Sequence, residues 1–402
     1  MKKKQLVICG GGNSAHTLIP LLNDSIFEVS IFTSRPEQWS DMLTLEWHNS
    51  RGEIMGKYSG PLKQASNDPN ALFPQADYIV FCMPVHQYRK ALHAIAPYLN
   101  RNKTIVIGTV YGQGGWNWMV DEIRKEYNFT NIVAFAFGLI PWVSRLVEYG
   151  HTGLTYGCMS MNYAAVSPRE YFHTIDDEFF NQVCFRWFEK GKVEQSDNFI
   201  SLTLSVDNQV IHTARCCAIH ERYGRQWDSK EDVPLFYRDF DALSSQLMEG
   251  LDRDYSKIRD AIKLRYPKKN FRHMLNYLSL EYFSHEYYSD DVLDSILSSQ
   301  TLHSITTPVV QNETGKWEIP KNHRFFMDDI YYGNCIAKWI AEILGIKVGT
   351  IDKILHWAQD VRGERIIDEY DSLILDSSDL TTPFKSGIPI FYGYKTIDDI
   401  ID

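Results

Sequence analysis

The sequence predicts an α/β domain built on a parallel sheet, residues 1–195, followed by an all-α domain, residues 196–402. Two observations support this prediction. Before residue 195, short apolar runs alternate with helical patterns, which is typical of parallel strands joined by crossover helices. After it, long segments with helical periodicity dominate. A polar stretch, "EKGKVEQSDN" at residues 189–198, marks the change.

Near-continuous apolar runs in the first domain predict strands that are buried on both faces. The expected strands are residues 5–10, 27–34, 76–84, 103–110 and 132–141, with helices at 14–23 and 85–99. In the second domain we expect helices within 198–224, 242–266, 291–302 and 328–345. Gly345 should cap the last of these, and Thr396, three residues before Asp399, should open a short terminal helix.

Composition excludes several classes of protein. A net charge of -10 over 402 residues offers no basic field for nucleic acid or an acidic membrane. The seven cysteines are scattered without a CxxC pair, and no HExxH occurs, so neither a disulfide framework nor a metal site is predicted. We expect a cytoplasmic protein with small-molecule partners and no membrane span. Its oligomeric state, monomer or homodimer, stays open.

The stretch "VICGGGNSAH", residues 7–16, contains a glycine pattern that follows a strand and opens a helix, and Asn13 within it is a candidate cofactor-binding residue. Gly10, Gly12 and Ala15 fit the pattern G-x-G-x-x-A. In that pattern the first glycine permits a tight turn, the second lets a pyrophosphate approach, and the alanine lets helix and strand pack closely. Free N–H groups at the helix start would bind the diphosphate. A Rossmann-type dinucleotide site is predicted; the alternative is a glycine turn without function.

The second strand ends at Thr33, Ser34 and Arg35, without the acidic residue that binds the ribose of NAD. Hydroxyls with an arginine suit a 2′-phosphate, so NADP is slightly favoured over NAD. The alternative is a solvated Arg35. Pro84, at the end of another strand, is expected to line the same cleft. Gln113, in the glycine-rich stretch "GTVYGQGGWNW", is a candidate donor to a substrate carboxylate; the alternative is a plain loop.

Candidate chemistry in the second domain rests on His212, which lies in an apolar helical pattern with Asn208 four residues earlier on the same face. Arg324 and Asp329 flank the start of the helix expected at 328–345. The alternatives are a buried structural histidine, helix capping by Asp328 and Asp329, and a surface charge at Arg324.

With these residues in place, the chain resembles the opine dehydrogenases over essentially its whole length. The segments that carry the resemblance are "CGGGNSAHTL" (9–18), "LIPWVSR" (139–145), the helix around His212, "VPLFYRDFD" (233–241), "NHRFFMDDI" (322–330), "DKILHWAQ" (352–359) and "YGYKTIDDII" (392–401). The glycine loop alone does not distinguish this family from other dinucleotide-binding proteins. The segment "PLFY", the Arg-x4-Asp pair and the C-terminal segment, occurring in this order, are much more specific to it.

The resemblance implies a reductive condensation of an amino acid amine with a 2-oxo acid, using NAD(P)H. It also implies that His212 is the acid–base group, that Asp329 is its partner, and that Arg324 binds the substrate carboxylate. A carboxylate beside His212 is expected to raise its pKa by favouring imidazolium. A planar guanidinium suits a carboxylate bound at two points.

One departure concerns Gly138 in "FGLIPW". Octopine dehydrogenase-like sequences carry a glutamate there that reads the substrate's guanidinium. The resemblance therefore implies a substrate other than arginine, for example a smaller or apolar amino acid, or an amine such as taurine.

Two other functions stay open: a 2- or 3-hydroxyacid or glycerol-3-phosphate type dehydrogenase, which needs no amine, and a dinucleotide-binding sensor without turnover.

Overall fold

The computed structural model describes residues 3–299, 302–303, 305–375 and 386–401. The chain forms two compact units, residues 1–202 with 283–285, and residues 203–282 with 286–402. The boundary expected at residue 195 falls inside strand β12 (Lys192–Ser196). Because β12 pairs with β11 of the large sheet, this strand stays with the first unit, and the chain leaves that unit only after Leu202.

The first unit contains an eight-stranded sheet in the order β12-β11-β8-β7-β6-β1-β2-β5. The neighbouring pairs from β5 to β8 are parallel, whereas β11 runs antiparallel to β8. The strands are β1 (Lys4–Cys9), β2 (Phe27–Phe32), β5 (Gln64–Ser66), β6 (Tyr78–Phe81), β7 (Ile105–Thr109), β8 (Ile132–Phe137) and β11 (Met161–Ser167), besides β12. The predicted parallel sheet is confirmed, and β5, β11 and β12 are additions to it.

Side chains alternate across this sheet and pack against helices on both faces. On one face, residues such as Ile8 and Phe135 join a core cluster with α1 (Asn13–Leu21) and with the helical segment that contains α5 (Phe172–Ile175), α6 (Asn181–Val183) and α7 (Phe185–Phe188). On the other, Phe81 contacts Tyr88 of α3 (Tyr88–Ile95) and Trp116 of α4 (Trp116–Glu126), with ring centroids 5.9 and 5.0 Å apart. Burial on both faces explains the continuous apolar runs.

The strand order places the glycine loop at a switch point of the parallel sheet. Strand β1 lies between β2 and β6, so the chain moves to one side of β1 and later returns on the other. In open parallel sheets, ligands bind outside the carboxyl ends of strands at such a switch point. The loop after β1 and residues 82–84 after β6 lie there.

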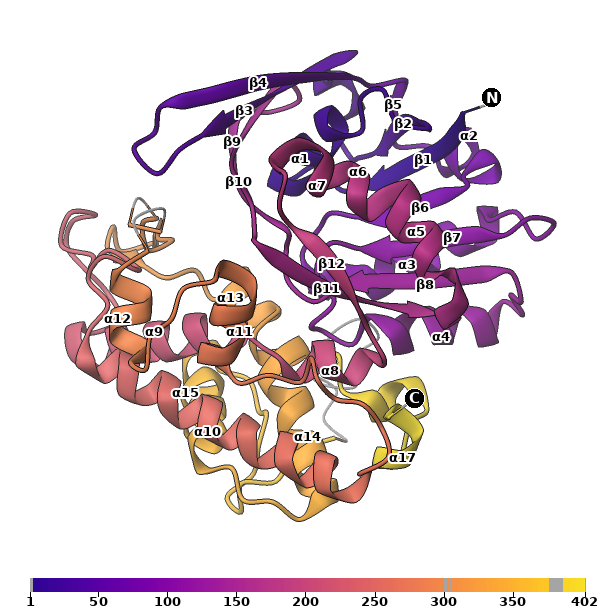
Figure 1. Cartoon of the computed structure of the whole chain (residues 1–402). Coiled ribbons are helices and arrows are strands. Elements are labelled where there is room, and N and C mark those ends of the chain that lie inside the picture. Colours follow the sequence, from indigo (N-terminus) through magenta and orange to yellow (C-terminus); the bar gives the residue numbers. More distant parts are fainter. Residues whose placement is uncertain (1–2, 300–301, 304, 376–385, 402) are drawn as a thin grey trace. The chain divides into compact units, whose positions relative to one another are not determined.

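A second sheet in this unit, which the sequence patterns did not predict, has the order β4-β3-β10-β9. Its strands are β3 (Met42–His48), β4 (Ile54–Pro61), β9 (Trp142–Glu148) and β10 (Thr152–Cys158). Helix α1 packs against it (Figure 1). The packing is close, since a Cβ atom at Gly60 would lie 2.6 Å from the Ile19 carbonyl oxygen.

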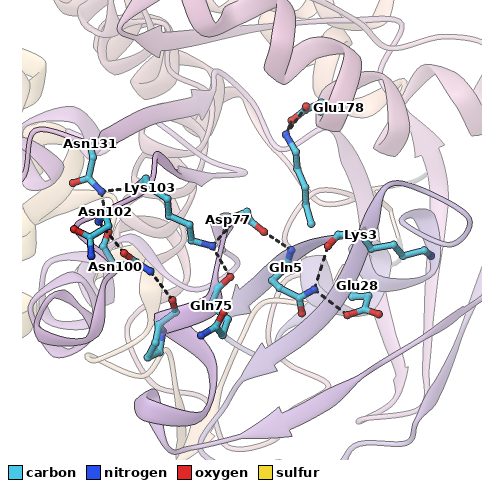
Figure 2. A network of polar contacts seen from close by, with 12 residues as sticks. Lys3, Gln5, Glu28, Gln75, Asp77, Asn100, Asn102, Lys103, Asn131 and Glu178 are labelled. Carbon is cyan, nitrogen blue, oxygen red and sulfur yellow. Dashed lines mark hydrogen bonds and ion pairs between the residues drawn. The ribbon is translucent and has the colours of Figure 1, made fainter. Parts of the chain in front are cut away.

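Polar side chains tie together the amino ends of the central strands (Figure 2). The backbone N–H of Gln5 donates to Asp77 at 2.8 Å, and Lys103 pairs with the same carboxylate at 2.7 Å. Lys4 pairs with Glu178 at 2.5 Å. These contacts fix the strand ends opposite the glycine loop, which leaves the carboxyl ends for ligand binding.

Where the structure describes it, the second unit is helical apart from a two-stranded ribbon, β13 (Val310–Gln311) and β14 (Trp317–Glu318). Its long neighbouring helices are α9 (Asn208–Tyr223) and α10 (Ala242–Arg265). The others are α12 (Val292–Leu297), α13 (Arg324–Met327), α14 (Cys335–Leu344), α15 (Gly349–Arg362) and α17 (Ile397–Ile400). Helices α8 (Phe199–Leu204) and α11 (Tyr277–His285) have residues in both units.

Both helix-end predictions in this unit are confirmed. Gly345 ends α14 in the left-handed region, and Thr396 forms a capping box with Asp399. The helix expected at 291–302 is present as α12, and residues 300–301 of that range lie outside the described part. Within the described residues, no helix is long and apolar enough to cross a membrane. All seven cysteines are buried and free.

Candidate active site

The three consecutive glycines sit at the carboxyl end of β1. Gly10 has a φ of 104°, and a Cβ atom there would lie 2.5 Å from the Cys82 carbonyl oxygen, so only glycine fits this turn. At Gly12, by contrast, a Cβ atom would meet no described residue within 4 Å. Helix α1 begins at Asn13 without a side-chain cap, and Ala15 in its first turn is fully buried. The open space and the uncapped helix start fit a dinucleotide diphosphate.

The residues predicted to read the adenosine end lie where β2 stops. Thr33 is buried, and Ser34 and Arg35 are exposed. The Arg35 guanidinium lies over the Tyr149 ring, 4.1 Å from its centroid. Pro84 is exposed just after β6, the strand next to β1.

Gln113 and Gly138 bond to each other. The Gln113 amide nitrogen donates to the Gly138 carbonyl oxygen at 3.0 Å, and its amide oxygen accepts from the Tyr111 hydroxyl at 2.9 Å. Gln113 is fully buried, and these bonds hold its loop against the residue that follows β8. Its role as a donor to substrate stays a prediction. A Cβ atom at Gly138 would lie 2.3 Å from the Tyr163 ring, so the present packing leaves no room there for a glutamate.

In the second unit, the structure brings His212 and Asp329 together. His212 Nδ1 lies 2.8 Å from Asp329 Oδ2, and only 2% and 5% of the two side chains are exposed. A carboxylate at this position accepts the Nδ1–H hydrogen and so leaves Nε2 as the group that exchanges a proton. The Tyr237 hydroxyl lies 3.3 Å from Nε2. The Phe325 ring covers the imidazole, with centroids 4.0 Å apart.

A π-helical segment, Ile330–Asn334, positions Asp329 directly before it. The Asn334 side chain donates to the Asp329 carbonyl oxygen at 3.1 Å. A Cβ atom at Gly333 would lie 2.2 Å from Gln209 Cγ, so this glycine lets the segment approach α9 closely. Single π-turns inside helices are frequent at functional sites. Here the turn and the glycine set the distance from Asp329 to His212.

Burial dominates the electrostatics of this pair. It lowers the pKa of His212 well below 6.5, the nearby Arg324 cation lowers it further, and the charges of Asp207 and Asp328 oppose both effects. Burial also raises the pKa of Asp329 well above its usual value, against the effect of Arg324. The expectation of a raised His212 pKa was therefore wrong. The loss of hydration on burial outweighs the favourable charges around the imidazole.

Arg324 opens α13 and is exposed. In the described part of the chain its guanidinium has no hydrogen-bond or ion-pair partner, and it lies 5.5 Å from the centroid of the Phe325 ring. It is therefore a cation available to an anionic ligand close to His212. Asn208, the half-buried first residue of α9, makes no side-chain hydrogen bond in that part of the chain.

Two polar neighbours of His212 were not singled out from the sequence. Tyr237 lies in the quoted segment "VPLFYRDFD", whose aromatic residues gave no separate signal of a polar role. Asp207 precedes Asn208 at the start of α9, and its buried Oδ1 atom has no hydrogen-bond partner among the residues that the structure describes. Burial raises the pKa of this carboxyl. An acidic residue inside the apolar helical pattern that contains His212 was the signal available from the sequence.

Residues 195–362 match the family described as "NAD/NADP octopine/nopaline dehydrogenase, alpha-helical domain". Over its full length the chain is 26% identical to an opine dehydrogenase of Haliotis discus hannai, covering 99% of that protein. It is 24% identical to an octopine dehydrogenase of Pecten maximus over 99% of this chain and 98% of that protein. A solved structure of octopine dehydrogenase with NADH and L-arginine superposes with a TM-score of 0.79 at 21% identity, covering 99% and 98% of the two chains.

The glycine loop, the strand order and these similarities define an NAD/NADP-dependent oxidoreductase that acts on CH–NH groups. Within the described residues, no three His, Cys, Asp or Glu side chains are grouped to hold a metal ion. The chain resembles the opine dehydrogenases over its whole length, and its residues 195–362 match the helical domain of the octopine/nopaline dehydrogenases.

Proposed function

We propose that this protein condenses the amine of an amino acid with the carbonyl of a 2-oxo acid such as pyruvate, and reduces the resulting imine to a secondary amine, reversibly. The observation that carries the proposal is the buried His212–Asp329 pair at 2.8 Å beside the unpaired Arg324 cation. The whole-length similarity to opine, tauropine and octopine dehydrogenases supports the reaction class. When bound, NAD(P)H supplies the hydride.

Arg324 has two effects in the proposed reaction. Its planar fork binds the carboxylate of the 2-oxo acid and fixes the carbonyl for attack by the amine. The same cation lowers the pKa of His212 while no anion is bound. A bound carboxylate neutralises that cation, so the pKa of His212 rises and the imidazole takes up a proton more readily when the 2-oxo acid is in place.

The protonated imidazole then donates its Nε2 proton to the oxygen derived from the carbonyl. The amine nitrogen forms its bond to carbon and passes one of its protons to the same oxygen. The C–O bond then breaks, and the oxygen leaves as water with these two protons. In the reverse direction Nε2 accepts the proton from the attacking water. Asp329 holds the ring through Nδ1 and stabilises the imidazolium, and Tyr237 fixes the opposite edge at 3.3 Å. General acid–base catalysis of this kind contributes about 10²–10⁴-fold.

We propose an amine substrate without a cationic side chain. Gly138 supplies no charge for a guanidinium, and the Tyr163 ring occupies the space that a side chain at position 138 would need. An unpaired buried cation costs several kcal/mol, of order 3–5. The partners are therefore small molecules, and the seven free thiols support a reducing cytoplasm as the compartment. A monomer or a homodimer is compatible with this proposal.

The test is a matrix of amino acids, including taurine and arginine, against 2-oxo acids, with oxidation of NADH and NADPH followed by absorbance. We expect oxidation only when both an amine and a 2-oxo acid are present. His212→Ala should reduce turnover by ~10²-fold or more while cofactor binding survives. A matched control is His220→Gln on the same helix, because His220 accepts a hydrogen bond from Trp357 at 3.2 Å away from the pair.

Two results would contradict the proposal. Oxidation with a 2-oxo acid alone, at a rate that no amine increases, would identify a hydroxyacid dehydrogenase. Tight cofactor binding without turnover in any combination would identify a binding protein.

A further inference from the structure

The middle residue of the three glycines makes room for a side chain from a distant part of the sequence. Tyr149 lies in the turn between β9 and β10, and a Cβ atom at Gly11 would lie 2.7 Å from its hydroxyl oxygen. The same hydroxyl is 3.4 Å from Thr33 Oγ1 at the end of β2. Gly11 thus leaves room for the Tyr149 hydroxyl, whereas Gly10 permits the turn and Gly12 has open space among the described residues.

The Tyr149 ring supports the Arg35 guanidinium. The guanidinium carbon lies 4.1 Å from the ring centroid, within the range of a cation–π contact. Arg35 is exposed, and across the described residues its guanidinium has no hydrogen-bond or ion-pair partner. The ring face thus holds the cation in place while all of its N–H donors stay available.

His16 fastens the turn that carries Tyr149. Its Nε2 accepts the backbone N–H of Gly150 at 2.7 Å, so the neutral ring carries its hydrogen on Nδ1 and donates it to the Gly12 carbonyl oxygen at 2.9 Å. Burial lowers the pKa of His16, which favours this neutral form. The imidazole therefore links the glycine loop directly to the Tyr149 turn.

We propose that Tyr149 is a specificity-determining residue of the cofactor site, which holds Arg35 so that its guanidinium binds the 2′-phosphate of NADP. This inference rests on the proposed function, in which NAD(P)H supplies the hydride. The end of β2 supports it, because Thr33 and Ser34 add hydroxyl donors and no acid stands there to repel the phosphate. Preorganisation by the ring reduces the ordering cost that a free arginine would pay on binding.

The test measures binding of adenosine 2′,5′-bisphosphate and of 5′-AMP to the full chain by titration calorimetry. We expect the bisphosphate to bind the unchanged protein about 10- to 100-fold more tightly, because charge-assisted hydrogen bonds to a phosphate are strong. Arg35→Ala should remove this preference. Tyr149→Leu should reduce it by about 2- to 5-fold, the size expected for an exposed cation–π contact.

Tyr149→Phe is the matched control, since it keeps the ring and removes only the hydroxyl contact to Thr33. It should retain the preference for the bisphosphate within about twofold, and a thermal unfolding curve for each variant verifies folding. In an Arg35→Ala background, Tyr149→Leu should cause no further loss of preference.

Equal affinity of the unchanged protein for the two nucleotides would overturn the proposal, as would an equal loss for both nucleotides in Tyr149→Leu. These nucleotides carry no nicotinamide and take no part in any reaction. A negative result here therefore differs from a failure of the proposed activity, which the substrate matrix reports.

Discussion

Replacing Asp329 by asparagine changes the partner of His212 with the least change of shape. The carboxylate oxygen lies 2.8 Å from His212 Nδ1, with 5% of the Asp329 side chain exposed. The asparagine oxygen can still accept the Nδ1–H hydrogen, so the ring keeps its place while the charge that stabilises imidazolium is lost. A hydrogen bond to a charged group contributes about 1.5–3 kcal/mol. At ~1.4 kcal/mol per factor of ten, kcat/KM should fall about 10- to 150-fold.

The assay is single-turnover oxidation of NAD(P)H in stopped flow, because product release limits many steady-state rates. A deuterated cofactor shows whether hydride transfer is being observed. The affinity for NAD(P)H should stay unchanged, since Asp329 lies in the second unit and the glycine loop in the first.

Asp328→Asn is the matched control, because it removes the same charge from the neighbouring position. Asp328 is also buried and acts on His212 only through its charge, whereas Asp329 contacts the ring. We expect a smaller loss for Asp328→Asn than for Asp329→Asn. Equal losses in the two variants, or a larger loss in Asp328→Asn, would refute the role given to the contact.

Three more predictions concern the same site. Arg324→Ala should raise the KM of the 2-oxo acid by ~10-fold or more, as expected for a lost charge-assisted contact, with little effect on the amine KM; a defect confined to the amine would contradict the assignment. Gly333→Ala should push the π-segment away from Gln209 and lower kcat, and a crystal structure should show a longer His212–Asp329 distance; unchanged kcat would show that the close approach is not needed. For the reverse oxidation, which needs neutral His212, kcat/KM should stay level down to about pH 6.5 and fall only below it, because burial lowers the pKa. Arg324→Ala should move this fall to higher pH, since the lost cation lowers the same pKa; a shift in the opposite direction would contradict the electrostatic argument.

Features of the fold could be predicted from the sequence where a local pattern has one main physical explanation. Gly10 needs a positive φ, and the apolar strand runs reflect burial on both faces, so the glycine loop and the parallel sheet were both predictable. The pairing of His212 with Asp329 was implied by family resemblance alone. The two residues lie 117 positions apart, and nothing in local periodicity links them.

Other features depend on contacts that no local pattern encodes. The second sheet alternates exposed and half-buried residues along β4, so its pattern lacks the apolar run of a core strand. Tyr149 reaches the glycine loop only because β9 and β10 pair in that sheet. The pKa of His212 is lowered because the imidazole is buried. A histidine in an apolar helical pattern indicates burial, but the pattern does not tell whether burial or the neighbouring charges decide the direction of the pKa shift.

The central claim is that the amine nitrogen becomes part of the reduced product. The most direct test supplies ¹⁵N-labelled amino acid, a 2-oxo acid and NAD(P)H, and then analyses the product by mass spectrometry. The account predicts a secondary amine that retains the ¹⁵N label and contains the carbon skeletons of both substrates. A reduced product without the label, such as a 2-hydroxy acid, would contradict it.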